Sequence, residues 1–421
     1  MRPRSSSPTE PDGALTRLAA EQWSPGWPPE PALPRALGPG GSDGVTGSDG
    51  STGLLRRARA GVVTIPHARV ARPAFPIGVA VLSRLYSTLL LALVPLLQPD
   101  SHVPRISGYR DTFLQWDSQW YLMIANTGYH AAPLQAGPFG GRHDFAFFPG
   151  WPTLLRAFRA VGIQPADVAA ILANALFIVA AVLMFLVLER ALGRTAARWG
   201  IVLLAFSPAA FTLSLAYSEP LFLVLVAGSF LLTGSRLRPI AAAAAMLTRV
   251  TGVGIAIGAA AAWWRNRRDW ISLATALAVA ASFAGWWGFI WLLTGDPLGW
   301  FLGSARWAYN LGLPAIWDTV VNLASPGFLE VVFVTVMLGA SVLLLRRNLE
   351  LGLFSVVAIG LSMLGAPVSS MPRHALVAFP AFGLLADRLG PRKSLALAIV
   401  FAAFEANAVW LSFVATRPFA P

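Results

Sequence analysis

The sequence predicts an all-α membrane protein, a helix bundle that crosses the bilayer several times and carries interfacial helices in its first outer loop. Two observations support this fold class. Of the 421 residues, 56% are hydrophobic and only 12% are charged, whereas soluble domains carry about 25% charged residues. The apolar residues also fall into repeated stretches that approach the roughly 20 residues needed to cross a bilayer.

Nine stretches have the composition of a membrane span. They are residues 74–97, 168–188, 199–216, 219–233, 270–293, 327–345, 350–367, 374–388 and 394–414. Residues 239–264 do not fit a single span, because Thr248, Arg249 and Thr251 lie at the centre of this apolar segment.

Arginine placement decides how residues 239–264 are interpreted, because short loops rich in Arg and Lys face the cytoplasm. The basic clusters lie at 190–198, 236–238, 265–268, 346–347 and 388–393. All five fall on one side only if residues 239–264 form a re-entrant hairpin of two short helices, with Arg249 at its tip. Broken helices at membrane depth are tolerated where they are buried or line a cavity. The hairpin therefore suggests a site.

This topology places the N-terminus in the cytoplasm and the C-terminus outside. Residues 71–414 then form the transmembrane domain of a multi-pass plasma-membrane protein, residues 415–421 form a short outer tail, and the longest outer loop is 98–167. Residues 1–70 are rich in Pro, Gly and Ser without an apolar period, so we expect a disordered cytoplasmic tail.

The net charge of +12 would suggest a nucleic-acid partner in a soluble protein. Here most of the basic residues lie in short loops between apolar segments, where they set topology. We therefore expect the lipid bilayer as a partner and no nucleic acid. The chain has no Cys, which excludes disulfides, thiolate metal sites and cysteine nucleophiles.

The first outer loop contains an amphipathic segment around Asp117, with Trp116, Trp120 and Tyr121 beside it. These aromatic residues are typical of the headgroup level of a membrane. A partly dry, aromatic setting favours a carboxylate as a general base. Two interpretations of Asp117 stay open on composition alone: a catalytic base, or a residue that caps or solvates an interfacial helix.

Three further outer segments carry charge. Glu219 begins a span after the turn that contains Tyr217, and it is expected either to cap that helix or to line a site. Arg249 lies at the hairpin tip, and Arg373 with His374 forms the last outer turn. Cations in a short outer loop run against the topology rule, so binding of a lipid phosphate and snorkelling to the headgroups are the two alternatives.

Four other polar residues admit competing interpretations. Arg84 and Glu405 lie inside predicted spans, where charge is costly. We expect Arg84 to snorkel toward the cytoplasm, and Glu405 to make either a structural polar contact or a proton relay. His143 and Asp144 form a weak candidate metal pair, because no third ligand is near them.

Five motifs resemble the bacterial branch of the PIG-V-type mannosyltransferases, which are GT-C enzymes. In order they are Trp116-Asp117-Ser118-Gln119-Trp120-Tyr121 continuing to Tyr129, Phe147-Phe148-Pro149-x-x-Pro152, Tyr217-Ser218-Glu219-Pro220, Leu247-Thr248-Arg249-x-Thr251-Gly252 and Arg373-His374-x-Leu376. The resemblance runs from about residue 74 to residue 414.

This resemblance implies a GT-C-type bundle that transfers mannose from a polyprenyl-phosphate donor to an acceptor hydroxyl outside the cytoplasm, with inversion. It implies that Asp117 acts on the acceptor hydroxyl and that Arg373, His374 and Arg249 bind the donor phosphate. Residues expected to line the substrate site are Trp116, Trp120, Tyr121, Tyr129, Phe148, Tyr217 and Glu219. The acceptor is expected to be a lipid or a glycan.

Two departures from the family pattern affect these expectations. Gly150 replaces a bulkier residue and is expected to widen the acceptor cleft, and His374 stands where Tyr is common. No Asp-x-Asp or Asp-Glu motif lies near the site, so we expect no metal and no cofactor apart from the lipid-linked donor.

The chief alternative is a polytopic transporter or lipid flippase, because broken helices also build transport sites. The two halves of the chain show no internal repeat, which argues against this alternative. A GT-C enzyme with another sugar donor and a scaffold without catalysis are further alternatives.

Overall fold

A computed structural model describes residues 73–98, 106, 108–134, 140–305, 313–321 and 327–415. The predicted tail 1–70 and all but the first residue of the predicted tail 415–421 lie outside this part of the chain. Residues 70–421 form one compact unit. Among the described residues the regular structure is helical, and a single bridge pairs Leu134 with Arg142.

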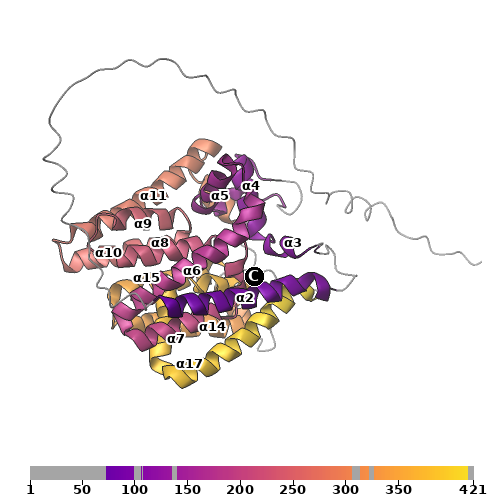
Figure 1. Ribbon diagram of the computed structural model, residues 1–421. Coiled ribbons are helices and arrows are strands. Elements are labelled where there is room, and N and C mark those ends of the chain that lie inside the picture. The colour runs from indigo at the N-terminus through magenta and orange to yellow at the C-terminus, as the bar shows by residue number, and fades with distance from the viewer. Residues whose placement is uncertain are drawn as a thin grey trace, which may run out of the picture. The chain divides into compact units, whose positions relative to one another are not determined.

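Ten helices make up the body of this unit (Figure 1). They are α2 (Ala74–Leu97), α6 (Pro165–Leu192), α7 (Arg194–Ala205), α8 (Glu219–Leu231), α9 (Arg238–Met246), α10 (Val253–Arg265), α11 (Trp270–Thr294), α14 (Phe328–Leu344), α15 (Leu349–Gly365) and α17 (Phe379–Val409).

Shorter elements connect these helices. The short α-helices are α3 (Tyr109–Phe113), α4 (Asp117–Thr127), α5 (Gly150–Ala160), α12 (Gly299–Ala305), α13 (Leu313–Val321) and α16 (Met371–Ala375). The tighter turns are η4 (Asp144–Ala146), η5 (Ala210–Ser214), η6 (Val250–Gly252) and η7 (Val368–Ser370), and a π-helical turn, η8 (Trp410–Val414), follows α17.

By length and composition, four helical segments of the described residues could each cross a membrane: Ala74–Leu97, Pro165–Leu192, Trp270–Thr294 and Phe379–Val414. Helices α8, α14 and α15 are apolar but shorter. The predicted all-α fold with several membrane-spanning helices is therefore confirmed for the described residues.

Helix α17 covers most of two predicted stretches, 374–388 and 394–414, and it bends sharply between them. Gly390 has φ 71° and ψ 174°, a backbone conformation that only glycine adopts without strain. The first arm reaches Asp387, whose carboxylate lies 4.0 Å from Arg347. The second arm leads back to Phe413, whose ring packs 4.5 Å from that of Trp116. The chain therefore reverses at Gly390.

The predicted span 199–216 is wrong as a single helix. Helix α7 ends at Ala205, and the chain continues through a turn into η5. Pro208 explains the break, because the residue before a proline is disfavoured in the α-helical region.

Arg84 compensates for this break, and the expectation that it snorkels toward the cytoplasm is wrong. Its side chain is buried, and one guanidinium nitrogen lies 2.9 Å from both the carbonyl oxygen of Ala210 and the hydroxyl of Ser214. The other terminal nitrogen donates to Ser83, whose hydroxyl in turn donates to the carbonyl of Ala205. Arg84 thus satisfies backbone groups that the broken helix leaves without partners.

Glu405 is fully buried and accepts a hydrogen bond from the hydroxyl of Ser87. The next turns of the same arm carry Val409 and Phe413, which belong to a cluster of buried apolar side chains with Leu91. This apolar layer separates Glu405 from the outer loop, which fits a structural contact between α2 and α17.

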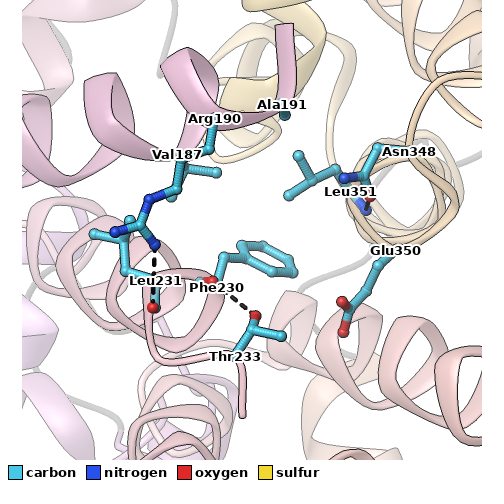
Figure 2. Close-up of a pocket in the computed structure, with 9 residues that line it drawn as sticks. All are labelled: Val187, Arg190, Ala191, Phe230, Leu231, Thr233, Asn348, Glu350 and Leu351. Atoms are coloured by element: carbon cyan, nitrogen blue, oxygen red, sulfur yellow. Dashed lines mark hydrogen bonds between the residues drawn. The ribbon is translucent and has the colours of Figure 1, made fainter. Parts of the chain in front are cut away.

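Four arginines mark one end of the bundle, here called the arginine end: Arg190 near the end of α6, Arg198 near the start of α7, Arg238 at the start of α9 and Arg347 between α14 and α15. Arg190 at the end of α6 donates to the carbonyl of Leu231 at the end of α8. A small cavity at this end lies between α6, α8 and the start of α15 and is lined by Val187, Arg190, Ala191, Phe230, Leu231, Thr233, Asn348, Glu350 and Leu351 (Figure 2).

Residues 238–265 form two short helices separated by a break. Arg238 at the start of α9 contacts Ser272 at the start of α11 and pairs with Glu350 at the start of α15. An added Cβ on Gly258 of α10 would also touch Glu350. The start of α9 and the middle of α10 therefore both lie near Glu350, and the break at 247–252 joins the other ends of the two helices.

The contact between α7 and the first arm of α17 generates a stability prediction. A Cβ added to Gly200 would lie 2.8 Å from the Cα of Gly383, whereas a Cβ on Gly339 of α14 would meet nothing within 4 Å. We expect Gly200→Ala to lower the free energy of unfolding by about 1–3 kcal/mol through overpacking.

Gly339→Ala is the matched control, and it should leave stability unchanged or raise it by about 0.5–1 kcal/mol through helix propensity. Thermal unfolding of both variants in one detergent provides the comparison. Equal shifts for the two variants would contradict close packing at Gly200.

Candidate functional site

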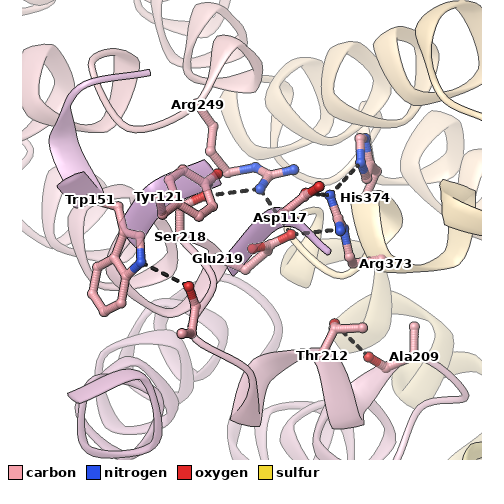
Figure 3. A network of polar contacts seen from close by, with 11 residues as sticks. Asp117, Tyr121, Trp151, Ala209, Thr212, Ser218, Glu219, Arg249, Arg373 and His374 are labelled. Carbon is pink, nitrogen blue, oxygen red and sulfur yellow. Dashed lines mark hydrogen bonds and ion pairs between the residues drawn. The ribbon is translucent and has the colours of Figure 1, made fainter. Parts of the chain in front are cut away.

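Figure 3 shows that five residues singled out by the sequence come together in one polar network. This network lies at the end of the bundle opposite the arginine end, because Arg249 in the break belongs to it. Each is delivered by a helix terminus or a helix break. Asp117 and Glu219 are the first residues of α4 and α8, Arg249 lies in the break between α9 and η6, and Arg373 and His374 lie in α16. These segments are far apart in sequence, so the cluster depends on the tertiary fold.

Arg373 is the centre of the cluster. Its Nη2 lies 2.6 Å from Oδ2 of Asp117, and its Nε lies 3.1 Å from Oε1 of Glu219. Its Nη2 also lies 3.3 Å from Nε2 of His374. The guanidinium stacks over the ring of Tyr217, with 4.7 Å between the guanidinium carbon and the ring centroid. Arg373 thus connects both carboxylates of the site.

Glu219 lies beneath this contact and is fully buried. The same Oε1 that faces Arg373 lies 2.9 Å from Nη1 of Arg249. Arg249 also donates to the hydroxyl of Ser218, which lies 2.8 Å from the hydroxyl of Tyr121. One buried carboxylate therefore holds two guanidinium groups, and Glu219 does not simply cap its helix.

The backbone just before Asp117 is strained, and this conformation orients the start of α4. The preceding residue, Trp116, has φ 50° and ψ −116° and is the one non-glycine residue with positive φ among the described residues. This conformation is costly for an L-residue and persists only where the surroundings enforce it. The Trp116 ring packs on Phe413, which supplies such a constraint.

The far end of α4 is fastened by α5. Arg156 donates to the carbonyl of Ala125, and Arg159 donates to the carbonyl of Asn126. These carbonyls belong to the last turn of α4, where no intrahelical partner is available. No role was predicted for these arginines from the sequence, although both lie in a segment with the pattern of an amphipathic helix.

Charges in the cluster shift the acid–base properties of its members. Burial lowers the pKa of His374 well below its usual value, and the positive charges of Arg373 and Arg249 lower it further. The imidazole is therefore neutral and accepts from Arg373. Burial also disfavours charge on Arg373, but Asp117 and Glu219 outweigh it and raise the pKa of Arg373, so this guanidinium stays charged.

The expected lining residues divide into two groups. Tyr121 and Tyr217 contact the charged cluster. By contrast, Trp120 stacks on Phe147, and Phe148 packs on Trp286.

Tyr129 belongs to the second group. It donates to the carbonyl of Phe147 and packs against the ring of Trp286. The structure therefore places Trp120, Tyr129 and Phe148 in the aromatic packing behind the cluster.

Gly150 does not widen a cleft, so this expectation is wrong. Its amide donates to the carbonyl of Leu247 at 2.7 Å. A Cβ at this position would lie 2.4 Å from Oγ1 of Thr248. The missing side chain lets α5 pack directly against the break that carries Arg249.

The weak metal hypothesis for His143 and Asp144 gains no support. Asp144 is buried and pairs with Nδ1 of His130 at 3.0 Å, while His143 stacks on Phe145. Burial raises the pKa of Asp144. In the part of the chain that the structure describes, no three potential ligands form a metal-binding group.

Comparison with known families adds independent evidence. Residues 77–255 match the family model Mannosyltransferase (PIG-V). Over these residues the chain is similar to the PIG-V-type mannosyltransferases, and this match supports a glycosyltransferase enzyme. The match contains Asp117, Glu219 and Arg249 and ends before Arg373 and His374. No curated protein matches the chain.

The shared carboxylate of Glu219 generates a prediction that a double-mutant cycle can test. Glu219→Gln leaves two buried guanidinium groups without their common partner, so we expect it to cost about 3–5 kcal/mol of stability. Adding Arg249→Gln should cost less than the sum of the single changes, with a coupling energy of about 2 kcal/mol.

The exposed ion pair between Arg110 and Asp167 is the control, because both side chains are more than half exposed. The same cycle there should give a coupling energy below about 1 kcal/mol. Additive effects at Glu219 and Arg249 would show that the pair is not energetically linked.

Proposed function

We propose that the chain transfers mannose from a polyprenyl-phosphate-mannose donor to a hydroxyl of a lipid or glycan acceptor on the non-cytoplasmic face of the plasma membrane. The transfer inverts the anomeric carbon. The observation that carries this proposal is the convergence of Asp117, Glu219, Arg249 and Arg373 at the end of the bundle opposite the arginine end. The family match supports the mannosyl group as the one transferred.

Asp117 is the proposed general base. Its side chain is 23% exposed, so it is the more accessible of the two carboxylates. In the reaction the acceptor oxygen forms a bond to the anomeric carbon, and its proton passes to the Asp117 carboxylate. The bond between the anomeric carbon and the phosphate oxygen breaks, and its electron pair stays on the lipid phosphate.

The leaving phosphate gains negative charge in this step, which requires fixed positive charge nearby. Arg373 and Arg249 are the proposed source, with His374 as a neutral hydrogen-bonding partner. Two guanidinium groups can bind a phosphate through forked contacts. This charge supply is the reason that the proposed mechanism uses no metal ion and no further cofactor.

The same proposal includes a membrane topology of nine spans and one re-entrant hairpin, residues 239–264, with the N-terminus in the cytoplasm. Support comes from the positions of Arg238 and Arg249. Arg238 lies at the arginine end of the bundle, and Arg249 lies among the site residues at the other end. A hairpin with Arg249 at its tip is consistent with both positions.

Mannosyl transfer by the purified protein tests the chemistry. We expect Asp117→Asn to lower the rate of transfer from polyprenyl-phosphate-mannose to a membrane-lipid extract by about 10²–10⁴-fold, the usual contribution of a general base. Asp167→Asn, in the first turn of α6, should transfer at the rate of the unaltered protein. Transfer should also persist in EDTA.

Equal transfer by Asp117→Asn and the unaltered protein would remove Asp117 from the mechanism. Movement of the lipid across the bilayer without any transfer would favour a flippase.

Topology is tested by cysteine labelling, because the chain has no native Cys. We expect single cysteines at Arg236 and Arg267 to be labelled from the same side of sealed vesicles. A cysteine at Val161, which is exposed in the first outer loop, should be labelled from the other side. Opposite-side labelling of positions 236 and 267 would contradict the hairpin.

A further inference from the structure

The contact between Asp117 and Arg373 conflicts with the roles proposed for both residues, because it occupies groups that each role requires. The Asp117 carboxylate has to take a proton, and the Arg373 guanidinium has to bind a phosphate. In the structure Nη2 of Arg373 lies 2.6 Å from Oδ2 of Asp117. While Oδ2 accepts this charge-assisted hydrogen bond, that oxygen is not available to the acceptor hydroxyl.

We propose that the donor phosphate and Asp117 compete for the same guanidinium group of Arg373, so that donor binding releases Asp117 to act on the acceptor. This inference rests on the proposed function and adds an order of events. The donor binds first, and only then is the base available. Asp117 is thereby kept from activating other hydroxyls before a donor is in place.

Glu219 makes such an exchange possible without displacing Arg373. Glu219 contacts Nε of the guanidinium and Asp117 contacts Nη2, so the two carboxylates hold different edges of the group. Glu219 is fully buried and also holds Arg249, whereas Asp117 is partly exposed. Glu219 is therefore the fixed partner and Asp117 the exchangeable one.

The ring of Tyr217 limits movement of Arg373 further, because the guanidinium stacks on it. Burial raises the pKa of Tyr217 well above its usual value, so this ring stays neutral through the reaction. Glu219 and Tyr217 act as positioning residues that keep Arg373 at one place while its partner on Nη2 changes.

The charges of Asp117 and of the donor phosphate change in opposite directions during transfer, which favours an exchange of partners on Arg373. When Asp117 takes the acceptor proton, it loses one negative charge, and the leaving phosphate gains one. The net charge of the site is therefore constant during transfer, and only its location changes. The Arg373 guanidinium balances the Asp117 carboxylate before the donor binds and the donor phosphate afterwards, so it faces the group that gains negative charge during transfer.

Binding of farnesyl phosphate, a short prenyl phosphate, tests the competition without any turnover. We expect Asp117→Asn to bind farnesyl phosphate about tenfold more tightly than the unaltered protein, because the competing charged hydrogen bond is lost. Farnesol, which lacks the phosphate, should bind both proteins equally. Titration of the detergent-solubilised full chain provides the measurement.

A second background separates competition from a general loss of negative charge. In Arg373→Gln, the Asp117→Asn change should alter farnesyl phosphate affinity less than twofold, because the shared guanidinium is absent. A tenfold gain that persists in this background would show a through-space charge effect and overturn the proposal. Arg373→Met, which also removes the charge, replaces Arg373→Gln if that variant does not fold.

Asp387→Asn is the matched control, because Asp387 also faces an arginine, Arg347, at the arginine end. It should leave farnesyl phosphate binding unchanged. Unchanged or weaker binding by Asp117→Asn, or no binding by any variant, would overturn the competition. Loss of mannosyl transfer with the predicted binding pattern intact would instead count against the proposed function alone.

Discussion

The site depends on one buried carboxylate that serves two arginines. Glu219 is fully buried, and a single oxygen of it faces both Arg249 and Arg373. An isolated carboxylate at such a position would be strongly disfavoured, and two adjacent guanidinium groups without it would repel each other. The three segments that carry these residues therefore hold one another in place. Asp117 joins the same network through Arg373.

Two breaks in helices coincide with polar networks in this chain. The break at residues 247–252 delivers Arg249, and the break after Ala205 is filled by Arg84. In each case a guanidinium forms part of a polar network at the interrupted helix. An arginine is suited to bonding the backbone groups at a helix break because its donors point in several directions. In apolar surroundings each backbone group left without a hydrogen bond is costly.

Much of the fold could be predicted from composition and the placement of arginine. The first predicted span coincides with α2, and the unusual centre of residues 239–264 correctly indicated two short helices with Arg249 between them. Periodicity could not show that α7 stops at Ala205, because the apolar run continues past Pro208. The proline was visible in the sequence, but the buried Arg84 that makes the break tolerable belongs to another helix.

The site was predictable as a set of residues but not as an arrangement. Outer-loop charges and motif order singled out Asp117, Arg249 and Arg373. Which carboxylate is buried depends on tertiary packing, so Glu219 could not be separated from Asp117 by sequence. Gly150 shows the same limit, because a missing side chain can either open space or admit a neighbour.

The bend at Gly390 has a consequence for the geometry of the distant ion pair. One arm of α17 follows α16, which carries Arg373, and the other arm ends at Phe413 against Trp116, the neighbour of Asp117. The two arms of α17 are thus linked to each other at their far ends, through the Asp117–Arg373 ion pair and the Trp116–Phe413 contact. The angle between the two arms of α17 therefore constrains the separation of the segments at their far ends. Gly390, at the bend between the two arms, is therefore linked through both arms to the segments that carry Asp117 and Arg373.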